Sequence, residues 1–129
     1  MILVDTDIMI DLLRQYQPAT EWLYSLAEDE RVVLPGYVVR ELVQGCRDKA
    51  EQYRLHRVLS NFSIIWPAAE NCDQAVATYY KFHLSHNAGL LDVLIAHTAL
   101  GHDLLLYTFN NKHYSFLKKL HTIQPYPKS

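Results

Sequence analysis

Three acidic residues that lie far apart in the sequence stand where they can meet and hold a metal ion. Asp5 directly follows an apolar run, Glu41 lies about a turn and a half into a predicted helix, and Asp92 begins another predicted helix. Hard divalent cations such as Mg²⁺ or Mn²⁺ prefer oxygen ligands, and clustered carboxylates repel one another until a cation binds. Such an ion polarises a phosphate oxygen and lowers the pKa of a bound water. The three acids therefore predict a metal site that hydrolyses phosphate esters.

Two neutral polar residues complete the candidate site. Thr108 and Asn110 follow the apolar run 104–107 and offer a hydroxyl and an amide. In open parallel sheets the functional crevice lies beyond the carboxyl ends of the strands, so residues that follow neighbouring strands meet there. We expect the runs 2–4 and 104–107 to be such neighbours. The predicted catalytic set is Asp5, Glu41, Asp92, Asn110 and Thr108.

The hydrophobic pattern indicates the elements that must position these side chains. Short continuous apolar runs predict buried strands, and apolar residues at helical spacing predict helices. Strands are expected at 2–4, 32–34, 62–65 and 104–107, with an edge strand at 122–124. Helices are expected at 8–13, restarting after Pro18, and at 38–43, 49–59, 70–86, 93–100 and within 110–120. This alternation predicts a three-layer α/β/α fold with a central parallel sheet of four or five strands.

Size and composition fit one globular domain over residues 1–129. Of these residues 50% are hydrophobic and 20% are charged, enough to bury a core without disulfides. Cys46 and Cys72 show no pairing pattern, so both are expected to be reduced, which favours the cytoplasm. The apolar run at the amino terminus is too short for a signal peptide or membrane span, so no membrane association is expected. A net charge of −2 means that nucleic-acid binding needs a local basic surface or a bridging metal.

Four stretches of the chain resemble the successive motifs of PIN-domain nucleases. They are residues 2–14 (ILVDTDIMIDLLR), 39–42 (VREL), 91–96 (LDVLIA) and 107–110 (YTFN). Each motif alone is weak, but four in this order and spacing are a fairly specific signature. The likeness covers nearly the whole chain and is greatest to the VapC-like toxins of type II toxin–antitoxin systems, which are of this length.

This resemblance implies an α/β/α fold, a Mg²⁺- or Mn²⁺-dependent endoribonuclease activity on an RNA substrate, homodimers, and inhibition by a small antitoxin protein. Asp5, Glu41 and Asp92 match the three most regular acids of the family and would be its metal ligands. Asn110 falls where many members carry a fourth acid, which puts the affinity for a second metal in question. Thr108 matches a hydroxyl that supports the site.

Other polar residues near these motifs have ordinary structural interpretations. Asp7 is expected to cap the helix that follows it, and Asp11 to pair with Arg14 on the same helix. Asp92 also suits a helix N-cap, a role that is compatible with metal binding. His113 follows the last motif by one helical turn and is near enough to approach the same crevice.

Basic and aromatic residues leave more than one interpretation open. Cations on the helices after residues 32–34 either line an RNA path or form a solvated face. They are Arg40, Arg47, Lys49, Arg54 and Arg57. The buried side of the 70–86 helix is expected to consist of Ala75, Val76, Tyr79, Tyr80 and Phe82, and its aromatic residues fit a core or a dimer interface. His83 and His86 share a helical face without further ligands, so zinc is not expected.

Two other functions remain open. Asp5-Thr6-Asp7 after an apolar strand also resembles the nucleophile motif of haloacid-dehalogenase-like phosphatases, in which the first Asp is phosphorylated. Against this, Met9 stands where that family has Thr or Val, and no later strand ends in paired acids. The second is a non-catalytic PIN-like module that binds RNA or a protein, which Asn110 motivates.

Overall fold

The fold is built on a parallel sheet whose central strands are short and buried. A computed structural model describes residues 1–128, and its five strands run parallel in the order β3-β2-β1-β4-β5. They are β1 (Ile2–Val4), β2 (Val32–Pro35), β3 (Ser63–Ile65), β4 (Leu106–Tyr107) and β5 (Thr122–Ile123). Every residue of β1 and β2 is buried, which explains their continuous apolar sequences, because such a sheet is covered on both faces.

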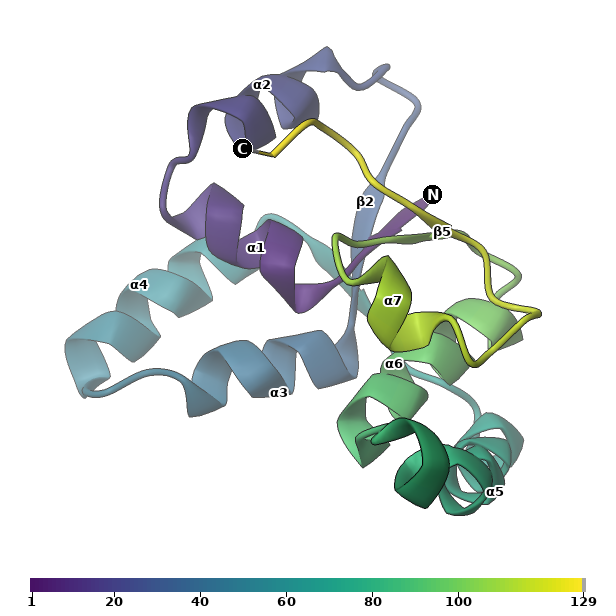
Figure 1. The fold of residues 1–129 in the computed structure, drawn as a ribbon. Helices are drawn as coiled ribbons and strands as arrows, with labels where there is room; N and C mark the ends of the chain where they lie inside the picture. The colour runs from purple at the N-terminus through teal and green to yellow at the C-terminus, as the bar shows by residue number, and fades with distance from the viewer. Residues whose placement is uncertain (129) are drawn as a thin grey trace.

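Helices flank this sheet (Figure 1). They are α1 (Thr6–Leu13), α2 (Gln17–Ser25), α3 (Gly36–Gln44), α4 (Lys49–Leu59), α5 (Ala69–His86), α6 (Leu90–Gly101) and α7 (Asn111–Tyr114). In Figure 1, α1 to α4 lie to the left of the strands, and α5 packs along α6 at the lower right. The predicted three-layer α/β/α arrangement is confirmed. Within residues 1–128 no helix has both the length and the apolar character needed to cross a membrane.

The register of β1 against β4 places their carboxyl ends side by side. Val4 lies opposite Tyr107, and the N–H of Asp5 donates to the carbonyl oxygen of Tyr107 at 2.9 Å. Asp5 and Thr108, which follow these two strands, therefore lie side by side at the same edge of the sheet. The prediction that the runs 2–4 and 104–107 are neighbours is confirmed.

The strand predicted at 104–107 is shorter than expected, since only its last two residues pair with β1. Asp103 has a left-handed backbone (φ 54°), and the N–H of Leu104 donates to the carbonyl of Ala99 at 2.9 Å. The first half of the apolar run therefore closes the end of α6 instead of entering the sheet. Leu105 is left 46% exposed.

The helix predicted within 110–120 is limited to α7. Beyond it the chain turns, with the N–H of Leu117 bonded to Tyr114 and that of Leu120 bonded to Leu117. Tyr114 and Leu120 are both buried. Residues six apart on a helix point about 120° away from each other, so a continuous helix could not bury both in the same core.

The buried side of α5 also differs from the prediction. Ala75 is fully buried, and Tyr79 and Phe82 pack against the cluster around it. Val76 and Tyr80 are exposed instead, at 42% and 81%. Positions 75, 79 and 82 follow helical spacing and share the face toward α6, whereas 76 and 80 lie roughly 100° further round the helix.

The segment after β5 returns to α1 and binds Asp11. The Tyr126 hydroxyl donates to Asp11 Oδ2 at 2.7 Å, and Lys128 Nζ lies 2.9 Å from the same oxygen. Asp11 is only 7% exposed, so its carboxylate needs donors to compensate for the lost water. The predicted pair between Asp11 and Arg14 is therefore wrong.

Candidate active site

Asp5 is a buried carboxylate held by three donors. It is 4% exposed. Its Oδ1 accepts the N–H of Thr6 at 2.8 Å, and its Oδ2 accepts the hydroxyls of Thr108 and Tyr114, each at 2.9 Å. Because each carboxylate oxygen has two lone pairs, Oδ1 keeps one for a further partner. Asp5 thus caps α1, and the prediction that Asp7 caps this helix is wrong.

The environment of Asp5 disfavours its charge. Burial, and after it the negative charge of Asp7, raise the pKa of Asp5 from 3.8 to about 6. The three hydrogen bonds lower this pKa but do not offset the desolvation. At neutral pH Asp5 is ionised at a cost of about 3 kcal/mol, a cost that a cation at Oδ1 would remove.

Asp7 lies beside Asp5 and ties α1 to the end of β4. Its Oδ2 accepts the N–H of Phe109 at 2.9 Å and lies 3.4 Å from the hydroxyl oxygen of Thr108. That hydroxyl has a single proton, so it is shared between the two carboxylates. Burial raises the pKa of Asp7 as well, although hydrogen bonds and the nearby charge of Lys128 lower it.

Glu41 and Asp92 reach the same place from two other helices, Glu41 from α3 and Asp92 from the first turn of α6. Burial raises the pKa of Glu41, and the charges of Asp92 and Asp7 raise it further. Burial also raises the pKa of Tyr114 far above its usual range, and the charges of Asp5, Asp92 and Glu41 add to this effect. All three predicted acids therefore lie near enough for their charges to influence the Tyr114 hydroxyl, which Asp5 alone contacts. We call Asp5, Asp7, Glu41 and Asp92 the acidic cluster.

His113 and Asn110, which follow β4, are placed differently. The Nε2 atom of His113 lies 2.7 Å from Asp92 Oδ2, so this histidine does reach the cluster. Asn110 is exposed, its N–H donates to the Thr108 hydroxyl at 3.0 Å, and its side-chain amide makes no hydrogen bond to the described residues. Asp92 is not the N-cap of α6, because Gly89 holds that position.

Tyr114 is the site residue that sequence reasoning missed. It is 2% exposed and donates to Asp5 across 109 positions of the chain. A tyrosine in a short mixed segment carries no local signal of this role. The available clue was indirect: a buried Asp5 needs more donors than the residues next to it supply.

The acidic cluster fits a hard divalent cation in its chemistry, since its donors are oxygens. Thr6 Oγ1 lies close enough to Glu41 to lower the pKa of the Glu41 carboxyl. The same Thr6 oxygen is buried, and within residues 1–128 it has no partner at hydrogen-bond geometry. An orphaned hydroxyl beside carboxylates marks a place for an ion or water. In the part of the chain that the structure describes, however, no three Asp, Glu, His or Cys side chains form a ready-made metal site. Asp92 faces His113 instead.

The chain is similar in sequence to known proteins. Residues 2–119 match the family model of the PIN domain. A protein named Ribonuclease VapC10, from Mycobacterium tuberculosis, is 36% identical over 122 residues, which cover 93% of this chain and 90% of that protein.

Solved structures share the fold. A toxin-antitoxin complex from Klebsiella pneumoniae has a chain that superposes with a TM-score of 0.77 at 25% identity, covering 99% of this chain and 100% of that one. VapBC2 from Rickettsia felis, solved with a DNA fragment from its promoter, gives a TM-score of 0.78 at 24% identity, covering 95% and 98%. Both TM-scores indicate that the fold is shared over nearly the whole chain.

The raised pKa of Asp5 predicts that the metal-free protein loses stability as the pH rises. The unfolded chain releases this proton near pH 3.8 and the folded chain near pH 6. The folded state therefore binds more protons in this window, and the free energy of unfolding falls from about pH 4 to about pH 6. Compared with Asp5→Asn, the unmodified chain should lose about 2 kcal/mol more between pH 4 and pH 7.

Urea denaturation in EDTA at several pH values measures this difference. Asp29→Asn, at an exposed loop position, is the matched control and should follow the unmodified chain. Parallel pH profiles for Asp5→Asn and the unmodified chain would contradict the prediction.

Proposed function

This chain belongs to the PIN domain family, and on that basis we propose that it is a divalent-cation-dependent endoribonuclease, the toxin of a toxin–antitoxin pair. The observation that supports the proposal is the buried carboxylate of Asp5, which accepts the hydroxyls of Thr108 and Tyr114, with Glu41 and Asp92 near enough for their charges to raise the pKa of Tyr114. Partly buried carboxylates that repel one another favour a cation, and that cation in turn attracts the phosphates of RNA. The acidic cluster thereby becomes a means of holding a polyanion.

Asp5, Glu41 and Asp92 would hold the ion, Mg²⁺ or Mn²⁺. Bound there, it would supply Lewis-acid stabilisation of the charge that develops on the scissile phosphate and would lower the pKa of the attacking water. Thr108 and Tyr114 act as positioning residues, because their hydroxyls occupy Asp5 Oδ2 and leave a lone pair of Oδ1 free.

His113 and Asn110 would complete the site on the α7 side. His113 orients the Asp92 carboxylate through its 2.7 Å contact, and release of that contact would free an oxygen of Asp92 for the ion. Asn110 is exposed where α7 begins, so its amide is available to the RNA backbone without adding negative charge.

Replacement of Asp5 by Asn tests the function. Asn keeps the size and one acceptor of Asp but removes the charge, so we expect RNA cleavage to fall by more than the roughly 10–100-fold that follows loss of an outer-shell partner of a metal. Cleavage of total RNA with Mg²⁺, with Mn²⁺ and with EDTA is the measurement. Asp29→Asn should cleave as the unmodified chain does.

The result also separates the alternative functions. Equal cleavage by Asp5→Asn and the unmodified chain would overturn the proposed site. A folded, unmodified chain that cleaves no RNA with any divalent cation would favour the non-catalytic module. Hydrolysis of a small phosphate ester without RNA cleavage would favour the phosphatase.

An antitoxin partner is supported by the structural neighbours, since these are toxin–antitoxin complexes. We expect a short protein to be encoded beside this chain, to bind it and to suppress its cleavage of RNA. Co-expression should relieve the growth arrest that the chain causes alone, and Asp5→Asn should still co-purify with the partner. A neighbouring protein that binds neither form would contradict the proposal.

A homodimer is supported by an apolar stripe on the outer face of α5. Val76, Tyr80 and Leu84 follow one another at intervals of four residues and are 42%, 81% and 93% exposed. Neighbours at this spacing share a helix face, and an exposed apolar face of this kind is typical of a protein interface. A second copy related by two-fold symmetry would cover it.

Leu84→Glu should therefore weaken self-association by at least about tenfold, because it places a charge in the proposed interface at its most exposed apolar residue. Sedimentation velocity over a concentration series measures this. Tyr24→Glu, on α2 and 83% exposed, is the matched control and should leave the dimer intact. A Leu84→Glu protein that dimerises as before would exclude this face.

A further inference from the structure

A second cleft is lined by cations and aromatic rings that take no part in the proposed cleavage. It lies between α5, the second half of α6 and the segment 115–119 that follows α7, and its volume is about 990 Å³. Among the described residues that line it there is no Asp or Glu. Its lysines and phenylalanines are Lys81, Lys118, Lys119, Phe82 and Phe116. We call this cleft the basic groove.

The positive charge of the basic groove is not neutralised by neighbours. Within residues 1–128, no carboxylate stands at ion-pair distance from Lys81, Lys118 or Lys119. The acids of α5, Glu70 and Asp73, precede Lys81 by at least eight residues, which is about 12 Å along the helix. The groove therefore presents a local positive surface on a chain of net charge −2, and it favours an anionic occupant.

Aromatic rings distinguish this groove from a simple anion patch. The ring centroids of Phe82 and Phe116 are 5.0 Å apart, both rings are partly exposed, and Lys81 Nζ lies 5.2 Å from the Phe82 centroid. Surfaces that bind single-stranded nucleic acid combine cations along the backbone with rings on which bases stack. Base faces are hidden in a duplex, so this combination favours a single strand.

One stretch of chain links the basic groove to the acidic cluster. Tyr114 donates to Asp5, and Phe116 and Lys118 line the groove only two and four residues later. Four residues span at most about 14 Å. In Figure 1, α7 and the segment after it lie beside α6, above α5. An RNA strand cut at the acidic cluster would therefore reach the groove within a short distance.

We propose that the basic groove holds the single-stranded RNA next to the scissile bond, with the three lysines on its phosphates and a base against Phe116. This inference rests on the proposed function, because it supplies the binding site for the same substrate. On α5, Lys81 lies roughly 60° and Phe82 roughly 160° round the helix from Leu84, so Lys81 borders the proposed dimer face and Phe82 points away from it.

The test measures RNA binding separately from cleavage. In an Asp5→Asn background with Mg²⁺, a fluorescent mixed-sequence single-stranded oligoribonucleotide is titrated at several salt concentrations. Lys118→Ala/Lys119→Ala should bind roughly tenfold more weakly, and the slope of log affinity against log salt should fall by about 1.4, because each lost phosphate contact contributes about 0.7. Phe116→Leu should bind at least about fivefold more weakly with the slope unchanged.

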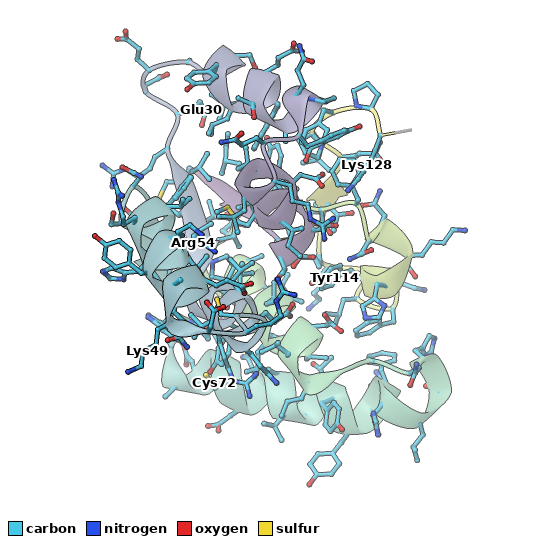
Figure 2. All side chains as sticks on the ribbon, turned by 90° about the vertical axis from the view of Figure 1, so that its left-hand side faces the viewer. Glu30, Lys49, Arg54, Cys72, Tyr114 and Lys128 are labelled. Carbon is cyan, nitrogen blue, oxygen red and sulfur yellow. The ribbon has the colours of Figure 1, made fainter. Side chains whose placement is uncertain are left out.

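The matched control is Lys49→Ala/Arg54→Ala, which removes the same charge from α4. Figure 2 shows Lys49 and Arg54 well separated from Tyr114 of α7. This variant should keep the affinity and slope of the parent. Thermal unfolding confirms that each variant is folded, and the lysine variants change only exposed positions.

Several outcomes would overturn the inference. One is a salt-dependence slope that falls for the α4 variant and not for the lysine variant. Another is a duplex of the same sequence that binds as tightly as the single strand. A third is a lysine variant that alters only dimerisation or antitoxin binding. The proposed function fails separately: an unmodified chain that cleaves no RNA defeats both ideas, whereas an active chain with unaffected lysine variants defeats only the groove.

Discussion

The burial of one carboxylate, Asp5, at the end of the central strand is the constraint on which the site depends. A desolvated anion needs donors or a cation, and its closest sequence neighbour supplies one backbone N–H. The remaining donors, Thr108 and Tyr114, come from the other end of the chain. The parallel pairing of β1 with β4 brings them there, so the sheet and the site are specified by the same contact.

The sequence was informative where one principle decides the outcome. Parallel strands end at one edge, so the meeting of Asp5 with Thr108 could be predicted from two apolar runs. The sequence was uninformative where a polar side chain binds a residue that lies far along the chain and belongs to no motif. Asp7 and Asp11 each have a plausible local partner on α1, but burial makes distant donors more valuable, and Asp11 binds Tyr126. The same holds for Leu104, whose apolar side chain fits a strand while its N–H closes α6.

Charge illustrates why composition alone misleads about binding. The chain is slightly acidic overall, yet four of its acids form the acidic cluster, where we propose a cation, and three of its lysines line the separate basic groove. The short segment from His113 to Lys119 joins the two regions. A nuclease of this size can therefore bind a polyanion through the local arrangement of its charges, without an excess of positive charge.

The segment after residue 119 belongs to the fold, which matters when the boundaries of a domain are chosen. The PIN model matches residues 2–119, but β5 and the buried Leu120 and Tyr126 lie beyond it. A recombinant fragment trimmed to the matched range would leave β4 as an unpaired edge, open to pairing between molecules. It would also strip both donors from the carboxylate of Asp11. Boundaries drawn from family similarity would thus turn a self-contained sheet into an aggregation-prone one.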